Sequence, residues 1–423
     1  MRRLLRALRD GAVIVALTAL LLAGFEWGAR QWQAEPFYVP HPDDPTLLTY
    51  NPGFSEQFFG TRWQTAPHAH VLPAKKAPGT RRIFVLGGSA AFGYPDSVFS
   101  FSRILAAQLD ACLPDTPVEV VNVAMPGTDS TVAALLAREL VQYEPDLFVV
   151  YAGNNEWSGP FGFLGPGQPR GAWADRLRRA FRGTLRLMAR LSPPPAYRSN
   201  AEPPDLWAPL ADRWTLQDYV ARRYVANMVA ISEAARSAGA PCIVVPPVAN
   251  AAGYAPLAPA PAQRDTAAQE AVADLLAARP GDACEAEFRA LRRLAQHDAA
   301  TMWQAAEAWA ACPPEVRWGL YARAVQWDTL PLRSDRSLRD ALAAARGWRA
   351  ALQAHAVLDA ATVNADPGLA NRYFVDHCHF TWQGNAKVAE RLLPRVLEAL
   401  GVDPATAAGA APTGGALRRA LGY

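Results

Sequence analysis

The stretch from Arg81 to Gly93, with the sequence RRIFVLGGSAAFG, constrains the fold of this chain most. Its apolar part, Ile83 to Leu86, is short and rich in β-branched and aromatic residues. Such a run is typical of a strand buried on both faces of a parallel sheet. Two glycines, Ser89 and small residues follow it, and a helical pattern begins at Phe101. A strand followed by glycines, a hydroxyl and a helix presents either a nucleophile or a phosphate-binding turn at the carboxyl edge of an α/β sheet.

The same alternation of strand and helix continues along the chain. Further buried strands are expected at 118–125, 147–153 and 242–248, with a weaker one at 356–363, and helices at 101–109, 131–143, 216–237 and 381–400. This spacing predicts a mainly parallel sheet of about five strands covered by helices on both faces. The expected fold class is therefore α/β, with three α/β/α layers as in flavodoxin-like proteins, a helical insertion and an N-terminal transmembrane helix.

The N-terminus carries an apolar run at 11–25, which is preceded by Arg2, Arg3, Arg6 and Arg9 and followed by Trp27 and Trp32. As a helix, this run spans about 22 Å, less than the roughly 30 Å of bilayer hydrocarbon, and its length suits a signal-peptide core. No small-x-small cleavage site follows it, and the tryptophans suit a membrane interface. An uncleaved signal anchor is preferred, with a cleaved signal peptide and a buried helix as alternatives. The arginines orient the amino end inward, which predicts a single-pass protein of the cytoplasmic membrane with its body on the extracytoplasmic, periplasmic side.

The expected domain organisation is a signal anchor at 1–33, a linker at 34–80, an α/β domain at 81–261 and 351–402, a helical insertion at 262–350 and a flexible tail at 403–423. Within the insertion, 299–328 resembles one tetratricopeptide-type helix pair. One such pair cannot bury its own apolar face, so the insertion is expected to pack on the core, where it also offers a surface for a protein partner. The basic stretch at 173–191 is expected to be a helix that lies on lipid headgroups, caps a substrate cleft or is simply solvated.

Composition narrows the partners and the compartment. The formal net charge is only +3, which gives no indication of nucleic-acid binding. The five cysteines show no metal-binding spacing. Cys284 and Cys312 can pair in an oxidising compartment, and the alternative is that all five are small buried hydrophobic residues.

Two residues near the carboxyl end, Asp376 and His379, precede the last helix. A carboxylate in this position can accept the imidazole Nδ1–H, so that Nε2 faces a serine hydroxyl. An isolated pair of this kind has little specificity. Two other strand ends add to it, since Gly127 lets a backbone N–H approach a ligand and Asn155 offers a side-chain amide. Backbone N–H groups and an amide are the donors that stabilise a tetrahedral oxyanion.

Taken in chain order, these loops resemble the four blocks of the SGNH/GDSL hydrolase family, and the chain is similar to a subgroup with a membrane anchor and a tetratricopeptide-like insertion. The resemblance implies that Ser89 is the nucleophile, His379 the general base and Asp376 the carboxylate that orients it. It also implies that the oxyanion donors are the Ser89 and Gly127 amides and the Asn155 side chain. No cofactor is implied. Two positions depart from the family, because Gly88 and Glu156 each stand where an Asp is usual.

Each of these residues also has a simpler interpretation. Ser89 can be a helix N-cap, and Gly127 and Asn155 can serve only their own loops. Glu156 is expected to accept hydrogen bonds in its loop, and Arg333 to lie on the surface or, alternatively, to reach an anionic substrate. A metal site in the segment 376–379 is disfavoured because four successive loop residues rarely converge on one ion. The phosphate-binding alternative is disfavoured because the glycine turn lacks the P-loop lysine and the third glycine of the dinucleotide motif.

The expected function is that of a membrane-anchored extracytoplasmic serine hydrolase acting on an ester of a small molecule, lipid or glycan through an acyl-enzyme. One alternative is an O-acyltransferase that modifies an envelope glycan, since only the acceptor differs. The other is a non-catalytic envelope scaffold that uses the insertion and the basic helix to bind partners.

Overall fold

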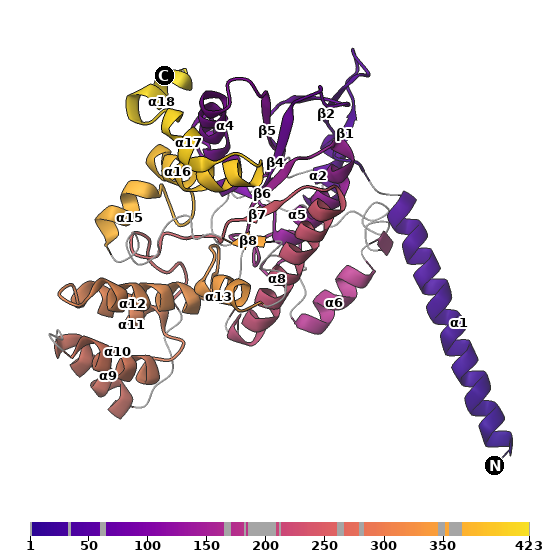
Figure 1. The fold of residues 1–423 in the computed structure, drawn as a ribbon. Coiled ribbons are helices and arrows are strands. Elements are labelled where there is room, and N and C mark those ends of the chain that lie inside the picture. Colours follow the sequence, from indigo (N-terminus) through magenta and orange to yellow (C-terminus); the bar gives the residue numbers. More distant parts are fainter. Residues whose placement is uncertain are drawn as a thin grey trace.

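The computed structural model describes residues 2–32, 35–59, 65–164, 171–181, 183–184, 209–210, 213–259, 266–278, 283–345, 352–354 and 366–422. At the centre of these residues is a parallel sheet in the order β5-β4-β6-β7-β8 (Figure 1). Its strands are β4 (Arg81–Gly87), β5 (Val118–Asn122), β6 (Leu147–Tyr151), β7 (Cys242–Val244) and β8 (Leu352–Ala354). The predicted parallel sheet is confirmed. The segment 356–363, where the fifth strand was expected, lies outside the described residues, and β8 precedes it.

The strand order determines where a ligand can bind. Numbered along the chain, the five parallel strands are ordered 2-1-3-4-5, the flavodoxin-like arrangement. The connections reverse direction between β4 and β6, which pair side by side with Gly87 opposite Tyr151. Sheets of this kind bind ligands in the crevice outside the carboxyl ends of the strands at such a point. The turn after β4 holds Ser89 and the loop after β6 holds Asn155, so both lie at this edge of the sheet.

Alternate residues of β4 pack against helices on opposite faces of the sheet. Phe84 and Leu86 belong to the core formed with α5 (Ser130–Leu140) and α8 (Arg213–Ser237). Ile83 and Val85 belong to the core formed with α4 (Phe101–Cys112) and α16 (Trp382–Ala399). All four side chains are fully buried, and burial of each contributes roughly 1.5–3 kcal/mol. The expected three layers are therefore present.

The segment expected to be a linker is largely folded. It forms an antiparallel sheet of β1 (Tyr38–Pro40), β2 (Leu47–Tyr50) and β3 (Val71–Pro73), with the helix α2 (Pro52–Phe59). Phe37 is buried and makes edge-to-face ring contacts with Tyr50 and Phe54. These aromatic residues join the core of α5 and α8, so the segment is part of the α/β domain.

The helical insertion has a core of its own. Its helices are α9 (Thr266–Ala278), α10 (Cys284–Leu294), α11 (Ala299–Ala308), α12 (Pro314–Trp327) and α13 (Arg336–Ala344). The pair α11 and α12 lies where a helix pair was expected. Cys284 and Cys312 form a disulfide, while Cys112, Cys242 and Cys378 are free thiols. In Figure 1 this group of helices lies below the sheet, with α13 nearest to β8 and α8.

The C-terminal segment also differs from the expected flexible tail. After α15 (Pro367–Tyr373) and α16, the chain forms α17 (Pro404–Ala407), a 3-10 turn (Ala408–Ala410) and α18 (Gly414–Ala420). Leu417 is buried in the core of α4 and α16. The apolar residues of this tail thus close the edge of that layer.

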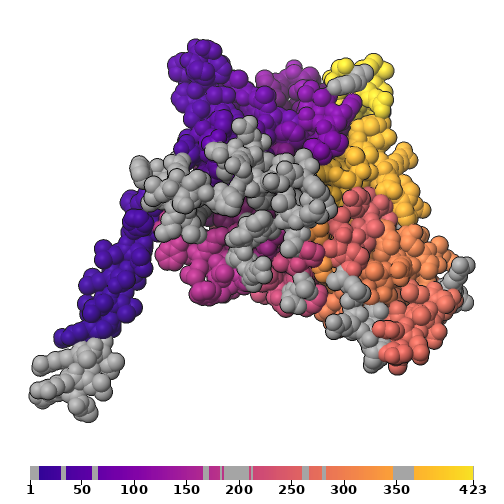
Figure 2. All heavy atoms as spheres, turned by 180° about the vertical axis from the view of Figure 1, so that it is seen from behind, coloured from indigo at the N-terminus to yellow at the C-terminus, as the bar shows by residue number. Residues whose placement is uncertain are grey.

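Helix α1 (Arg2–Trp32) projects from the body of the protein (Figures 1 and 2). Among the described residues it is the one helix long and apolar enough to span a membrane, over Arg9–Ala29 with a mean hydropathy of 1.9. Its buried Glu26 accepts hydrogen bonds from the N–H groups of Gly183 and Thr184, at 2.7 and 2.8 Å. The basic helix α6 spans Ala172–Ala180, and the rest of the predicted 173–191 helix lies mostly outside the described residues.

Candidate functional site

Ser89 is placed at the carboxyl edge of the sheet by the glycines that precede it. Gly87 ends β4, and a Cβ at this position would lie 2.1 Å from the carbonyl oxygen of Tyr151. Glycine therefore allows β4 and β6 to approach where the chain turns. The short helix α3 (Ser89–Phe92) follows, with Gly88 as its N-cap and Ser89 as its first residue. Ser89 is thus not the N-cap itself.

His379 joins Ser89 to Asp376. Its Nε2 atom lies 2.7 Å from Ser89 Oγ, and its Nδ1 atom lies 2.6 Å from Asp376 Oδ2. The other carboxylate oxygen of Asp376 accepts from the N–H groups of Cys378 and His379, both at 2.9 Å. The structure thus brings together the three residues expected to form a triad, in the expected order of contacts.

The electrostatics of this group follow from burial and mutual contact. Burial alone would raise the pKa of Asp376, but its hydrogen bond to His379 and the imidazole charge outweigh burial and hold that pKa well below its usual range. Burial would lower the pKa of His379, whereas the Cys378 sulfur, 3.9 Å from Nδ1, and the Asp376 carboxylate raise it above its usual value. The carboxylate therefore stays charged and makes the imidazole a stronger base.

Besides Ser89, two residues are expected to donate to an oxyanion, and they lie on loops that are tied together by a hydrogen bond. Gly127 has a φ of +79°, in a turn closed by a 3.2 Å hydrogen bond from Thr128 N to Met125 O. The Asn155 side chain donates to Thr128 O at 3.1 Å. Within the described part of the chain, neither the Ser89 N–H nor the Gly127 N–H has an acceptor. These two N–H groups can therefore donate to a ligand.

Gly88, the departure from the family pattern, has a steric cause. A Cβ at this position would lie 2.4 Å from Nδ2 of Asn155 and 3.0 Å from Thr128 O. The amide of Asn155 thus lies where the Cβ of an Asp at position 88 would stand. Gly88 and the position of Asn155 depend on each other.

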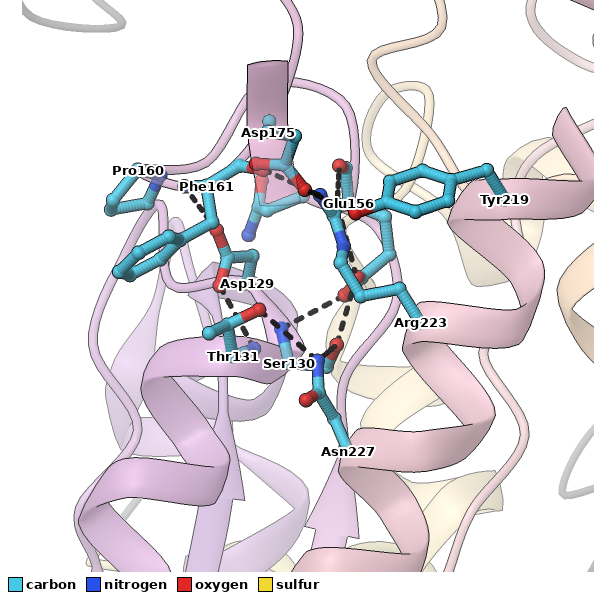
Figure 3. Close-up of polar contacts among 12 residues, drawn as sticks. Asp129, Ser130, Thr131, Glu156, Pro160, Phe161, Asp175, Tyr219, Arg223 and Asn227 are labelled. Carbon is cyan, nitrogen blue, oxygen red and sulfur yellow. Dashed lines mark hydrogen bonds and ion pairs between the residues drawn. The ribbon is translucent and has the colours of Figure 1, made fainter. Parts of the chain in front are cut away.

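Glu156 accepts hydrogen bonds as expected, but the donor is Ser130 at the start of α5 and not its own loop, and its side chain is fully buried, which the sequence did not indicate. Both of its carboxylate oxygens bind Ser130 (Figure 3). Burial and the neighbouring Asp129 carboxylate raise the pKa of Glu156 to about 7, while Arg223 opposes the shift. No sequence signal identified Arg223 as its neighbour, because it comes from the distant helix α8.

Arg333 was expected to lie on the surface or to reach an anionic substrate. Both expectations are wrong, because this residue is buried and binds the backbone of a loop. Its guanidinium donates to the carbonyl oxygens of Asn250 and Tyr254, at 2.6 and 2.7 Å. Burial lowers its pKa to about 10. Asn250 in turn donates through its N–H to His377 O at 2.9 Å and through its side chain to Asp376 O at 3.0 Å. Arg333 therefore braces the loop that carries Asp376.

Two further features lie beside His379. The Tyr94 ring, 49% exposed, has its centroid 4.8 Å from that of the imidazole. The potential ligand atoms of Asp376, Cys378 and His379 lie within 4.8 Å of one another. A metal ion there would compete with the bond between Asp376 and His379 Nδ1. No motif in the sequence indicated Tyr94.

Comparison with known protein families found no match, and comparison with curated proteins found none either. Solved structures do show similarity. A lipase/acylhydrolase from Enterococcus faecalis is 14% identical, over 75% of this chain and 95% of its own, with a TM-score of 0.30. A GDSL-like lipase from Bacteroides thetaiotaomicron is 12% identical, over 76% and 88%, with a TM-score of 0.27. An acetyl xylan esterase, AlAXEase, is 10% identical, over 74% and 99%, with a TM-score of 0.31.

The solved structures that this chain resembles are thus lipases and esterases, one of them GDSL-like. Because identities and TM-scores are this low, the function is inferred below from the geometry of the site.

Proposed function

We propose that this protein is a membrane-anchored serine hydrolase that cleaves ester bonds on the extracytoplasmic side through an acyl-enzyme. The observation that supports it most is the contact of Ser89 Oγ with His379 Nε2 at 2.7 Å, with Asp376 on the other ring nitrogen at 2.6 Å. A serine hydroxyl is a poor nucleophile unless an adjacent base removes its proton. A base oriented by a carboxylate serves that purpose.

Acylation begins when Ser89 Oγ attacks the ester carbonyl carbon and His379 Nε2 takes the hydroxyl proton. Asp376 holds the imidazole in the required tautomer and stabilises the imidazolium that forms. When the tetrahedral intermediate collapses, the imidazolium gives its proton to the leaving alcohol. Water then attacks the acyl-enzyme while His379 accepts a proton from it. When this second tetrahedral intermediate collapses, the imidazolium returns the proton to Ser89 Oγ, and the acid is released.

The negative oxygen of each tetrahedral intermediate is stabilised by the N–H groups of Ser89 and Gly127 and by the amide of Asn155. These roles are supported by where the three groups lie. Ser89 and Asn155 follow the paired strands β4 and β6, and the Gly127 loop is joined to the Asn155 loop by the hydrogen bond to Thr128 O. One such donor lowers the barrier by about 2.7–4 kcal/mol.

The experiment is turnover of a short-chain aryl ester by the full-length protein in mild detergent. S89A is expected to lose measurable turnover with an unchanged thermal unfolding midpoint. S237A is the matched control, because among the described residues the Ser237 hydroxyl donates to Ala234 O, at the end of α8. Undiminished activity of S89A would contradict the proposal. Adding a sugar acceptor and analysing the products separates hydrolysis from transfer to a carbohydrate hydroxyl.

The membrane location is supported by two independent features. Helix α1 offers an exposed apolar segment preceded by arginines, which are retained on the cytoplasmic side. The Cys284–Cys312 disulfide suits an oxidising compartment. A phosphatase reporter that is active only outside the cytoplasm, fused after the last residue, is expected to be active and to sediment with membranes. An inactive fusion or a soluble one would contradict this placement.

A further inference from the structure

We propose that Glu156 is a positioning residue of this site, which rests on the proposed function. Its carboxylate ties the loop carrying Asn155 to the first turn of α5, directly after the loop carrying Gly127. In this way it fixes the two amide donors relative to Ser89.

Both hydrogen bonds of the Glu156 carboxylate are made with one residue, Ser130, while its ion pair with Arg223 is longer, at 3.8 Å. Oε1 accepts from Ser130 N and Oε2 from Ser130 Oγ, both at 2.8 Å (Figure 3). Ser130 is the first residue of α5 and follows the Gly127 turn by two positions. Its hydroxyl is fixed in turn by the side chain of Asn227, which donates to it at 2.8 Å. A carboxylate bonded through both oxygens to one residue restricts distance and direction together.

A second hydrogen bond joins the same two loops. Asn155, next to Glu156, donates through its side chain to Thr128 O at 3.1 Å. Adjacent residues of one loop thus hold positions 128 and 130 of the other. The Asn155 amide also lies against the backbone at Gly88, 2.4 Å from where a Cβ would stand. A shift of the 155–156 loop would therefore move the amide away from the Ser89 turn.

The loop is held from its other side by Arg223. Its guanidinium donates to the backbone oxygens of Glu156 and Phe161, both at 2.7 Å, and to Asp175 Oδ2 at 3.2 Å. Asp129 accepts from Phe161 N at 2.7 Å (Figure 3). Arg223 holds the backbone of the loop, and the Glu156 carboxylate holds the loop in position against the first residue of α5. The carboxylate is thus the part that determines how the two donor loops meet.

The test compares kcat and KM for an aryl ester in four variants of the full-length protein. E156A loses both contacts with Ser130. E156Q keeps an oxygen for Ser130 N–H, and its amide NH2 meets Ser130 Oγ, so it serves as the conservative rescue. S130A loses only the hydroxyl contact. E139A is the matched control, because Glu139 is a half-buried acid of the same helix α5 whose carboxylate accepts from the Phe37 N–H.

We expect kcat to fall about 10- to 100-fold in E156A, with KM within about twofold. An oxyanion donor stabilises the transition state and not the bound substrate, so displacing it lowers kcat and leaves KM nearly unchanged. E156Q should stay within about threefold of the wild type, and S130A should lose about three- to tenfold. The rate at which a fluorophosphonate labels Ser89 should fall in parallel with kcat. E139A should lower the unfolding midpoint with little change in either rate.

Wild-type kcat and labelling rate in E156A would overturn the positioning role. Should E156A fail to fold, S130A decides: a reduced kcat at an unchanged unfolding midpoint supports the role, and an unchanged kcat overturns it. If the wild type neither turns over esters nor labels at Ser89, the proposed function itself is wrong. The failure of the positioning role alone looks different, because the wild type is then active and labelled.

Discussion

The Nε2 atom of His379 lies 2.7 Å from the hydroxyl oxygen of Ser89, although 290 residues separate the two along the chain. Ser89 follows β4, and His379 lies in the loop that leads into α16. The two meet because β4 ends and α16 begins at the carboxyl edge of the sheet, near the point between β4 and β6 where the connections reverse direction. The base is therefore in contact with the hydroxyl before any substrate binds.

Replacing Asp376 with Asn should lower kcat by about 10⁴, because the amide no longer holds the imidazole in the required tautomer. The base acts in its neutral form, so activity rises as pH passes the pKa of His379. Asp376 raises that pKa, and its loss should move the rising limb of kcat/KM to lower pH. D366N is the control, since Asp366 caps the nearby α15 at the surface. An unchanged kcat, or a rising limb of kcat/KM that moves to higher pH, would contradict the role of Asp376 in the triad.

Introducing the family's usual residue with G88D should impair this protein. Even the Cβ of G88A would stand 2.4 Å from Asn155 Nδ2, so the amide must move and lose its bond to Thr128 O. We expect kcat to fall about 10- to 100-fold in both variants with KM nearly unchanged. G409A, whose Cβ meets nothing within 4 Å, is the control. A fully active G88D would show that Asn155 is not a donor in this position.

Glu156 should make stability depend on pH. Its pKa is raised from 4.5 to about 7, first by burial and then by Asp129, so the native state binds its proton more tightly than the unfolded chain does. The contribution of Glu156 to the free energy of unfolding is therefore fully present below about 4.5 and is lost as pH rises through about 7. Urea unfolding of E156Q and wild type across this range should show E156Q gaining relative stability with rising pH. A constant or falling difference would contradict the raised pKa.

Removing the disulfide with the double variant C284A/C312A should loosen the insertion. The two cysteines are 28 positions apart, and opening a loop of this length lowers stability by roughly 3–4 kcal/mol. Limited proteolysis should then cleave between α9 and α12 at lower protease concentration. C112A, which removes a free thiol, should behave like the wild type. Equal resistance of the double variant and the wild type would mean that the insertion is held by its apolar core alone.

The sheet could be predicted because it depends on local patterns, and the contacts among Ser89, His379 and Asp376 were implied by the resemblance of their loops to the SGNH/GDSL blocks. The apolar run of β4 and the glycines at 87 and 88 identify a strand end. The loops with Gly127, Asn155 and His379 follow further strands or precede the last helix, and parallel strands bring their carboxyl ends to one edge.

Other features depend on contacts that no local pattern encodes. Glu156 is buried because Arg223, 67 residues away on α8, binds its backbone. Arg333 is buried because loop carbonyls 79 and 83 positions away surround its guanidinium. The fold of 34–80 likewise depends on Phe37 reaching the core of α5 and α8. In each case a distant element provides the partner, so the sequence alone predicted a loop acceptor for Glu156, a surface position for Arg333 and a linker for 34–80.

The most direct measurement is the site of covalent labelling by a fluorophosphonate in the folded, full-length protein. Intact mass and peptide mapping should find a single phosphonyl adduct on Ser89. The adduct should be absent from S89A and should form far more slowly in H379A, which lacks the base. No adduct on the folded wild type, or an adduct on another serine, would contradict Ser89 as the nucleophile.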